Sequence, residues 1–277
     1  MFAGTVHSTW DNMKIWLPFL KSDPTIAVIR LTGMIGGQGF ASLNDAKLAP
    51  AIEKAFEKGK PAAVALVVNS PGGSPVQSSL IGARIRRLAE EKKIPVIAFV
   101  EDVAASGGYW LAAAADEIYA DPSSVVGSIG VISASFGLDR FIESYGVERR
   151  VYTAGKSKSM LDPFRPENPD DVAHLKTLLE DIHVNFKDHI TARRADKLTS
   201  DVDLFTGEVW LGQRAMELGL IDGIGHLKPM MKARFGDKVR FREYSAKRGV
   251  FSRLGARVVQ DAVQGIEERA AFARFGL

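Results

Sequence analysis

The sequence has no cysteine in 277 residues. This absence excludes disulfide bonds, cysteine-ligated zinc and a cysteine nucleophile. No apolar run approaches the roughly 20 residues that a membrane-spanning helix requires, and the first residues lack the apolar core and cleavage site of a signal peptide. The net charge is only +3, with no dense block of lysine or arginine, so a nucleic-acid partner is not expected. We therefore expect a cytoplasmic or peripherally membrane-associated protein.

Histidine is missing from the part of the chain that carries the candidate nucleophile turns. None lies between His7 and His174, so a Ser–His–Asp triad through His226 has no local support. We expect His183 and His189, on one amphipathic helix with His174, to be surface or interface residues. No His-Glu-x-x-His motif is present, and no metal or other cofactor is expected.

Apolar runs alternate with segments of helical spacing, which predicts an α/β fold with mostly parallel strands. Strands are predicted at 25–35, 62–68, 94–100, 117–120, 148–153 and 239–244. Helices are predicted at 43–58, 75–93, directly after Ser106, and at 136–145, 172–190 and 251–272. We expect an N-terminal arm at 1–24, one domain at 25–245 and a C-terminal helix at 246–277. The aromatic residues of the arm allow peripheral contact with a membrane surface.

Ser106 lies between a predicted strand and a predicted helix. Glu101 and Asp102 are expected to end the strand, and only alanine and glycine surround the serine. A serine in such a turn is accessible to a substrate backbone, and the Gly107 N–H at the start of the helix can stabilise an oxyanion. An ordinary helix N-cap remains the alternative.

Two further segments carry groups that a serine nucleophile needs. Asn-Ser-Pro-Gly-Gly at 69–73 follows a buried strand, and its Gly73 N–H is a candidate for the second half of an oxyanion hole; a tight turn with a helix cap is the alternative. The polar loop at 154–160 contains Lys156 and Lys158. A desolvated, neutral lysine can act as the base of a Ser–Lys dyad, although most loop lysines are simply solvated.

Four motifs, N-S-P-G-G, A-A-S-G-G-Y, G-S-I-G-V and A-G-K-x-K, occur in this order. The chain thereby resembles the bacterial signal peptide peptidase A family of serine peptidases, which has the Clp protease/crotonase fold. The resemblance implies that Ser106 is the nucleophile and Lys158 the general base. It also implies that Ser128 orients the lysine and that Gly73 and Gly107 form the oxyanion hole. Many family members carry an N-terminal membrane anchor, and none is detected here.

The leading interpretation is a serine endopeptidase that uses a Ser–Lys dyad on extended, mainly apolar peptides, such as remnants of signal peptides. A crotonase-type acyl-thioester enzyme, with Glu101 and Asp102 as acidic groups, and a non-catalytic scaffold of the same fold are the alternatives. In longer family members, which resemble two fused copies, the lysine and the serine come from different halves. The resemblance therefore implies a homo-oligomer in which Ser106 and Lys158 of each site belong to different protomers.

Overall fold

A computed structural model describes residues 23–36, 42–155, 157–245 and 269–277 of the chain. Its centre is an eight-stranded sheet in which β6, β5, β3, β2, β1 and β8 are neighbours in this order, while β4 pairs with β3 and β7 with β4. All pairings are parallel except that of β5 with β6. The strands are β1 (Thr25–Thr32), β2 (Ala63–Ser70), β3 (Val96–Ala105), β4 (Glu117–Ala120), β5 (Val125–Gly127), β6 (Val209–Leu211), β7 (Gly223–Ile224) and β8 (Arg240–Tyr244). The predicted α/β class with mostly parallel strands is confirmed.

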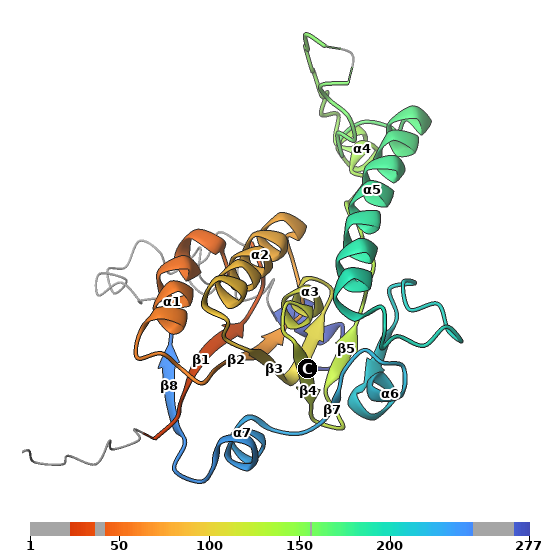
Figure 1. Ribbon diagram of the computed structural model, residues 1–277. Coiled ribbons are helices and arrows are strands. Elements are labelled where there is room, and N and C mark those ends of the chain that lie inside the picture. The colour runs from red at the N-terminus through yellow and green to blue at the C-terminus, as the bar shows by residue number, and fades with distance from the viewer. Residues whose placement is uncertain (1–22, 37–41, 156, 246–268) are drawn as a thin grey trace, which may run out of the picture.

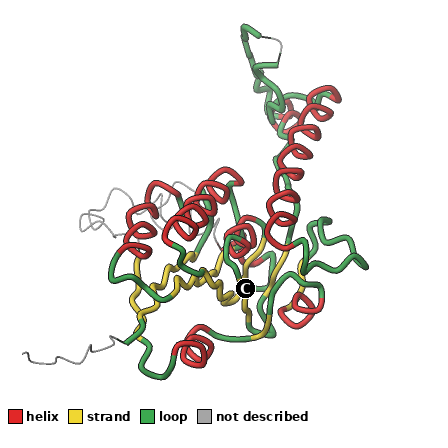
Figure 2. The backbone as a smooth tube through the Cα atoms, in the orientation of Figure 1, coloured by secondary structure: helices red, strands yellow, loops and turns green. Residues whose placement is uncertain are grey.

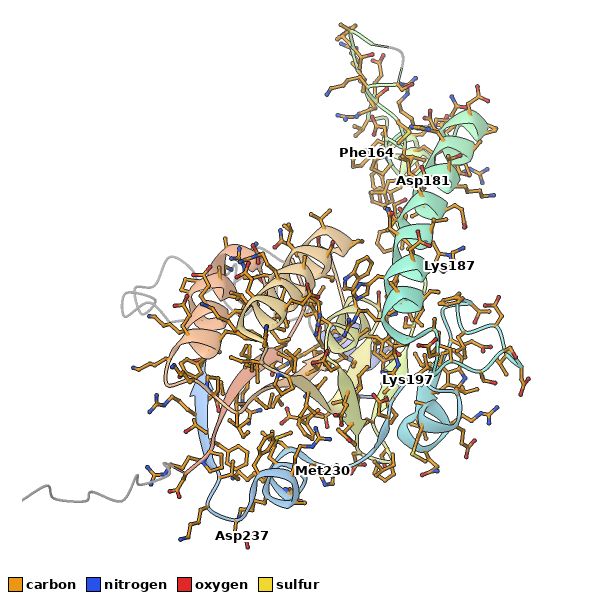
Figure 3. All side chains as sticks on the ribbon, viewed as in Figure 1. Phe164, Asp181, Lys187, Lys197, Met230 and Asp237 are labelled. Atoms are coloured by element: carbon orange, nitrogen blue, oxygen red, sulfur yellow. The ribbon has the colours of Figure 1, made fainter. Side chains whose placement is uncertain are left out.

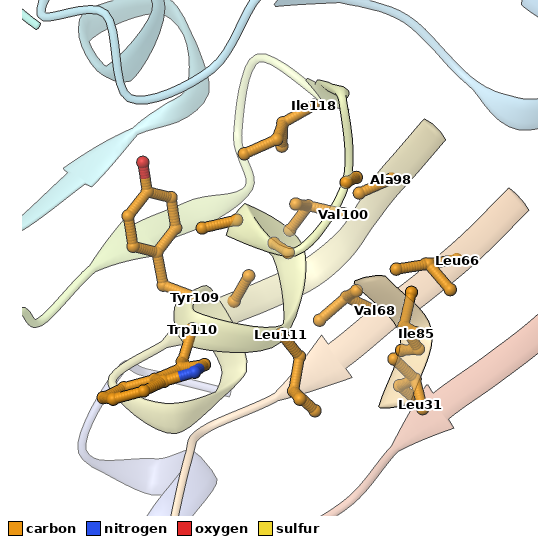
Figure 4. Packing of buried hydrophobic residues seen from close by; sticks show 14 of the residues in the cluster. Leu31, Leu66, Val68, Ile85, Ala98, Val100, Tyr109, Trp110, Leu111 and Ile118 are labelled. Atoms are coloured by element: carbon orange, nitrogen blue, oxygen red, sulfur yellow. The ribbon is translucent and has the colours of Figure 1, made fainter. Parts of the chain in front are cut away.

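Both faces of the sheet are covered, as the near-continuous apolar strands predict. The helices α1 (Asp45–Glu57), α2 (Pro75–Lys92) and α3 (Gly107–Ala113) lie on one face, and α7 (Leu227–Phe235) lies on the other (Figures 1 and 2). Successive residues of β1 alternate between the two cores: Ile29 belongs to the helix-covered cluster and Val28 to the cluster around Met231 of α7. Figure 4 shows the larger cluster, in which α2 and α3 meet the strands through Ile85, Leu111, Leu31, Leu66 and Val68.

The central strand β3 is longer than predicted, because it continues through Glu101 and Asp102 to Ala105. Two different partners support its two ends: Ile97 to Val100 pairs with β4, and Val103 to Ala105 pairs with β5. The register with β2 shifts between these two parts. The two acidic residues are therefore exposed and lie within the strand, at the point where its partner changes from β4 to β5, rather than at its end.

The helix α5 (Pro169–Arg194) is attached to the body by its last turns only. Its buried side chains are Phe186, Ile190 and Arg194. Arg193 donates to the carbonyl oxygens of Ala113 (3.1 Å), the last residue of α3, and of Ala115 (2.9 Å). Its 26 residues span roughly 39 Å. The first half of α5 consequently stands away from the sheet (Figure 1).

Residues 131–155 and 157–168, including α4 (Asp139–Ser144), accompany the outer half of α5 and form with it a projecting arm. Figure 3 shows Phe164 near Asp181 of α5, far from Lys197, which follows the end of this helix. The strand predicted at 148–153 is absent from this described segment. Its β-branched and aromatic residues, Val151, Tyr152 and Thr153, favour a strand, but no neighbouring strand is available to pair with it here, and Tyr152 is 91% exposed.

The predicted arm at 1–24 and the predicted C-terminal helix lie mostly outside the described residues, so those domain boundaries remain predictions. Of the helix, the structure describes 269–277, which begins with a short helical segment. Within the described ranges, no helix has both the length and the apolar character needed to cross a bilayer.

Candidate active site

Ser106 occupies a sharp turn between β3 and α3. Its φ of 52° and ψ of −123° place a non-glycine residue in a sparsely populated conformation, which costs about 1–3 kcal/mol and commonly marks a functional site. The backbone is held there because the Ser106 N–H donates to the Gly127 carbonyl (2.8 Å) and the Ser106 carbonyl accepts from Trp110 N–H (3.0 Å). The side chain makes no capping hydrogen bond to α3. This observation disfavours an ordinary N-cap and favours a strained strand-to-helix nucleophile turn.

The Gly72–Gly73 turn lies directly against the turn at Ser106. A Cβ atom added to Gly72 would lie 2.8 Å from the Ser106 Cβ and 3.0 Å from the Gly107 nitrogen. Buried Ser70 fixes the start of this turn, since its hydroxyl donates to Gly33 O (2.7 Å) and accepts from Gly72 N–H (3.2 Å). The close approach therefore requires glycine in this turn.

The structure brings the backbone nitrogens of Gly73 and Gly107 together. A Cβ atom on Gly107 would lie 3.4 Å from the Gly73 nitrogen. Gly73 forms a bridge with Ile35 that uses the Gly72 carbonyl (2.9 Å) and the Ser74 N–H (2.8 Å), which leaves the Gly73 N–H out of that pairing. Gly107 is the first residue of α3, so its N–H has no partner within the helix.

Ser128 follows β5 as Ser106 follows β3. It also has a positive φ, 53°, and its N–H donates to Glu208 O (2.6 Å). Because Ala105 and Gly127 are partners in the sheet register, the two serines leave the same edge of the sheet side by side. Both contribute to one cavity.

This cavity has a volume of about 720 Å³ and runs from the glycine turns to α5. Ser106, Ser128, Gly73 and Gly107 all line it. Apolar side chains supply much of the remaining wall: Met34, Trp110, Val131, Ile132, Ile182, Phe186, Phe205 and Phe275. Such a wall suits apolar side chains of a ligand, with a few polar groups grouped at one end.

Lys158 is not brought to Ser106 within this chain. It lies in the projecting arm, where its N–H donates to Gly155 O (3.2 Å), and it is not among the cavity residues. Lys156, the other predicted candidate, lies outside the described residues. Four of the five predicted site residues therefore gather at one place, and the fifth lies apart.

Of the two histidines that we expected at the surface or at an interface, His183 lines the cavity and His189 packs on Trp110, a residue of the cavity wall. The His183 Nε2 lies 3.3 Å from the Ile129 carbonyl, and the His183 side chain lines the cavity. His189 stacks on Trp110 with ring centroids 4.5 Å apart, and its Nε2 lies 3.1 Å from the Trp110 carbonyl. Since a carbonyl oxygen only accepts, each Nε2 carries a proton. The helical spacing of His183 with Phe186 and of Phe186 with Ile190 was the signal that sequence reasoning missed.

Burial lowers the pKa of His189 to about 4, although the hydrogen bond to the Trp110 backbone opposes this shift. The imidazole is consequently neutral at pH 7. Trp110 also packs on Phe186, with ring centroids 5.1 Å apart. His189 and Phe186 together hold the indole that forms part of the cavity wall.

The family comparison matches residues 88–235, more than half of the chain, to peptidase family S49. The chain belongs to this family. A putative protease of Synechocystis sp. is 34% identical over 73% of its own length and 76% of this chain. The chloroplastic serine protease SPPA of Arabidopsis thaliana is 33% identical over 29% of its length and 73% of this chain. The expected signal peptide peptidase A type and the expected class, serine peptidases, are confirmed at the level of the S49 family.

A relative with higher sequence identity has a name that does not describe a peptidase. A protein of Brucella abortus named Na(+)/H(+) antiporter NhaA is 47% identical over 94% of this chain, but the match covers only 38% of that protein. The chain spans less than two thirds of the length of several relatives that it matches. Among solved structures, a mutant of the 1510-N membrane-bound stomatin-specific protease has a TM-score of 0.44 and 13% identity, over 82% of this chain and 100% of its own. That similarity is too low to carry an argument about this site.

Proposed function

We propose that this S49 chain is an endopeptidase that cleaves extended, mainly apolar peptides, with Ser106 as nucleophile. The observation that carries the proposal is the strained turn of Ser106, whose hydroxyl is not used as a cap and which lies at the cavity beside two glycine N–H groups. Ser106 Oγ attacks the peptide carbonyl carbon and transfers its proton to a base. The C–N bond then breaks as the base returns the proton to the leaving amine. Water attacks the acyl-enzyme in the same way and releases the acid.

The oxyanion of each tetrahedral intermediate is assigned to the N–H groups of Gly73 and Gly107. They lie on two different turns that are packed together, so their directions are fixed before the reaction begins. Donors that are already oriented stabilise developing charge without reorganising. The positive φ of Gly73, 141°, reserves that position for glycine.

The base in this proposal is Lys158 of a neighbouring protomer, oriented by the Ser128 hydroxyl. A lysine with an ordinary pKa of about 10.4 must lose water contacts to become neutral, and the arm of a single chain offers little burial. The arm also exposes large apolar residues: Phe136 is 83% and Tyr145 73% exposed. Exposed apolar groups of this size favour contact with another protein surface, so assembly supplies both the burial and the lysine.

His183 is a weaker candidate for the base, although it lies at the same cavity. Its Nε2 carries a proton and donates to the Ile129 carbonyl. The other nitrogen, Nδ1, lies 3.9 Å from Glu180 Oε2 on the same helix. Nδ1 is the unprotonated nitrogen and lies too far from Glu180 for a hydrogen bond, but among the described residues no hydrogen bond joins His183 to Ser106.

The two carboxylates that the acyl-thioester alternative requires are engaged elsewhere. Asp102 accepts a hydrogen bond from Asn69 Nδ2 (2.6 Å), and Glu101 pairs with Arg30 (3.1 Å). Neither carboxylate is among the residues that line the cavity. The groups at the cavity serve acyl transfer to a serine better than proton abstraction by a carboxylate.

The decisive experiment combines a fluorophosphonate probe with turnover of a fluorogenic apolar peptide. We expect the probe to label Ser106, and Ser106→Ala to abolish labelling and lower kcat/KM by three or more orders of magnitude. Ser123→Ala, in an exposed turn, is the matched control. Thioester turnover without labelling would establish the crotonase-type alternative, and the absence of both activities would leave the scaffold.

A further inference from the structure

The segment 269–277 lies against the cavity of its own chain. Phe272 and Phe275 pack against Val103 and Ala105 of β3 and against Val125 of β5. Ala105 immediately precedes the nucleophile. Figure 1 shows the dark blue segment beside α3 and β5. The apolar surface at the start of the Ser106 turn is therefore covered by two phenylalanines from far along the sequence.

The same segment forms part of the wall of the catalytic cavity. Ala271, Arg274 and Phe275 line it together with Ser106 and Ser128. Phe275 takes part in both arrangements, since it touches the β3–β5 surface and faces the cavity. An extended peptide that reaches Ser106 along β5 must share this space with the segment.

We propose that segment 269–277 is an internal occupant of the peptide-binding cavity, and that an extended peptide binds by displacing it. The surface that Phe272 and Phe275 cover is then a subsite for aromatic side chains of the peptide. The inference rests on the proposed peptidase function, because it names what regulates access to the same site.

The way the segment is held suits an occupant that can be displaced. Its backbone hydrogen bonds join its own residues, as in Phe275 N–H to Phe272 O (2.9 Å) and Gly276 N–H to Ala273 O (3.1 Å). Among the described residues, no hydrogen bond or ion pair is found between this segment and the rest of the chain; its contacts there are apolar. A peptide with aromatic side chains can make the same apolar contacts in place of Phe272 and Phe275, and the exchange leaves no buried polar group unpaired.

The test compares the full chain with the double variant Phe272→Ala/Phe275→Ala. We expect KM for an apolar fluorogenic peptide to fall about tenfold with kcat unchanged, because the segment no longer competes with the peptide for the cavity and the open state is populated more fully. Labelling of Ser106 by a fluorophosphonate should accelerate by a similar factor. Leu277→Ala is the control, since Leu277 is half exposed and does not line the cavity. An unchanged KM and labelling rate would overturn the inference, and so would a raised KM, which would make the segment a required wall.

A second measurement does not depend on turnover or on the stability of that variant. A synthetic, fluorescent nonapeptide with the sequence of residues 269–277 should bind the Ser106→Ala chain, and should bind more tightly when phenylalanines 272 and 275 of the chain are also replaced. The same peptide with alanine at both phenylalanine positions should not bind. Equal binding of both peptides would refute the aromatic subsite. If the full chain cleaves no peptide, the endopeptidase proposal fails while this binding result still decides the inference.

Discussion

Ser106 and Ser128 leave two paired strands at neighbouring positions, and both have a positive φ, 52° and 53°. Their predecessors, Ala105 and Gly127, are register partners, and the Ser106 N–H donates to the Gly127 carbonyl (2.8 Å). The turns that follow β3 and β5 are thus coupled by this hydrogen bond and by the pairing of Ala105 with Gly127. The arrangement gives Ser128 a fixed place beside the nucleophile.

Ser128→Ala should lower kcat by about tenfold to a hundredfold and leave KM nearly unchanged. The hydroxyl positions a lysine amine in our proposal and forms no bond with the substrate, so its loss weakens general-base catalysis. The pH–rate profile of kcat/KM should shift with it, because the lysine loses a hydrogen-bond partner. An unchanged rate and profile would remove Ser128 from the site, and Ser123→Ala serves as the control for a serine in an exposed turn.

Gly73→Ala should reduce kcat by about a hundredfold to a thousandfold, the usual effect of losing one oxyanion donor. The added Cβ would collide with the Ile35 backbone at a φ of 141°, so the N–H must move. Gly146→Ala is a matched control, since Gly146 also has a positive φ (67°) but meets nothing within 4 Å. Equal kinetic losses in both variants would show that backbone strain, rather than the oxyanion hole, is responsible.

Stability should fall as the pH decreases from about 6.5 to about 4, partly through His189. Burial lowers the pKa of this imidazole in the folded protein to about 4, so the unfolded chain binds the extra proton first. The resulting stabilisation is complete above the unfolded pKa and is lost as the pH falls toward the folded one; it amounts to at most about 3 kcal/mol. Urea unfolding at pH 7 and pH 5 should show a smaller difference for His189→Gln than for the unaltered chain. The exposed His174→Gln should keep the full difference.

The parts of the fold that depend on local sequence pattern are predictable from the sequence. The apolar runs of β1 and β2, the serine turn and the glycine turn were all located correctly, because burial on both faces and glycine-specific turns leave clear sequence signals. The predicted end of β3 is wrong, because Glu101 and Asp102 lie where the partner of β3 changes from β4 to β5, and this pairing depends on tertiary structure. Residues 148–153 have strand-like residues and no strand to pair with. The positions of His183 and His189 depend on how α5 crosses α3, which single-helix periodicity does not specify.

Lys158→Ala should lower kcat/KM by several orders of magnitude, while Lys156→Ala should have a small effect. The two lysines are neighbours in one loop, so each variant controls for the loss of a positive charge in that segment. A chelator should not inhibit the unaltered enzyme. If Lys156→Ala is the inactive variant and Lys158→Ala is active, the base has been assigned to the wrong residue of the loop.

Mixing inactive subunits should restore activity, because we assign Ser106 and Lys158 of one site to different protomers. In this chain Ser106 lies in the cavity and Lys158 in the arm, so a mixture of Ser106→Ala and Lys158→Ala subunits contains some sites with both groups intact. In a closed ring mixed at random in equal amounts, about a quarter of the serine–lysine contacts pair two intact residues. The measurement is peptide turnover after subunit exchange has been verified by mass spectrometry or energy transfer between labelled subunits. Each variant alone, after the same treatment, is the control. A mixture that remains inactive after verified exchange, or a monomer from size exclusion that cleaves peptide, would refute the shared site.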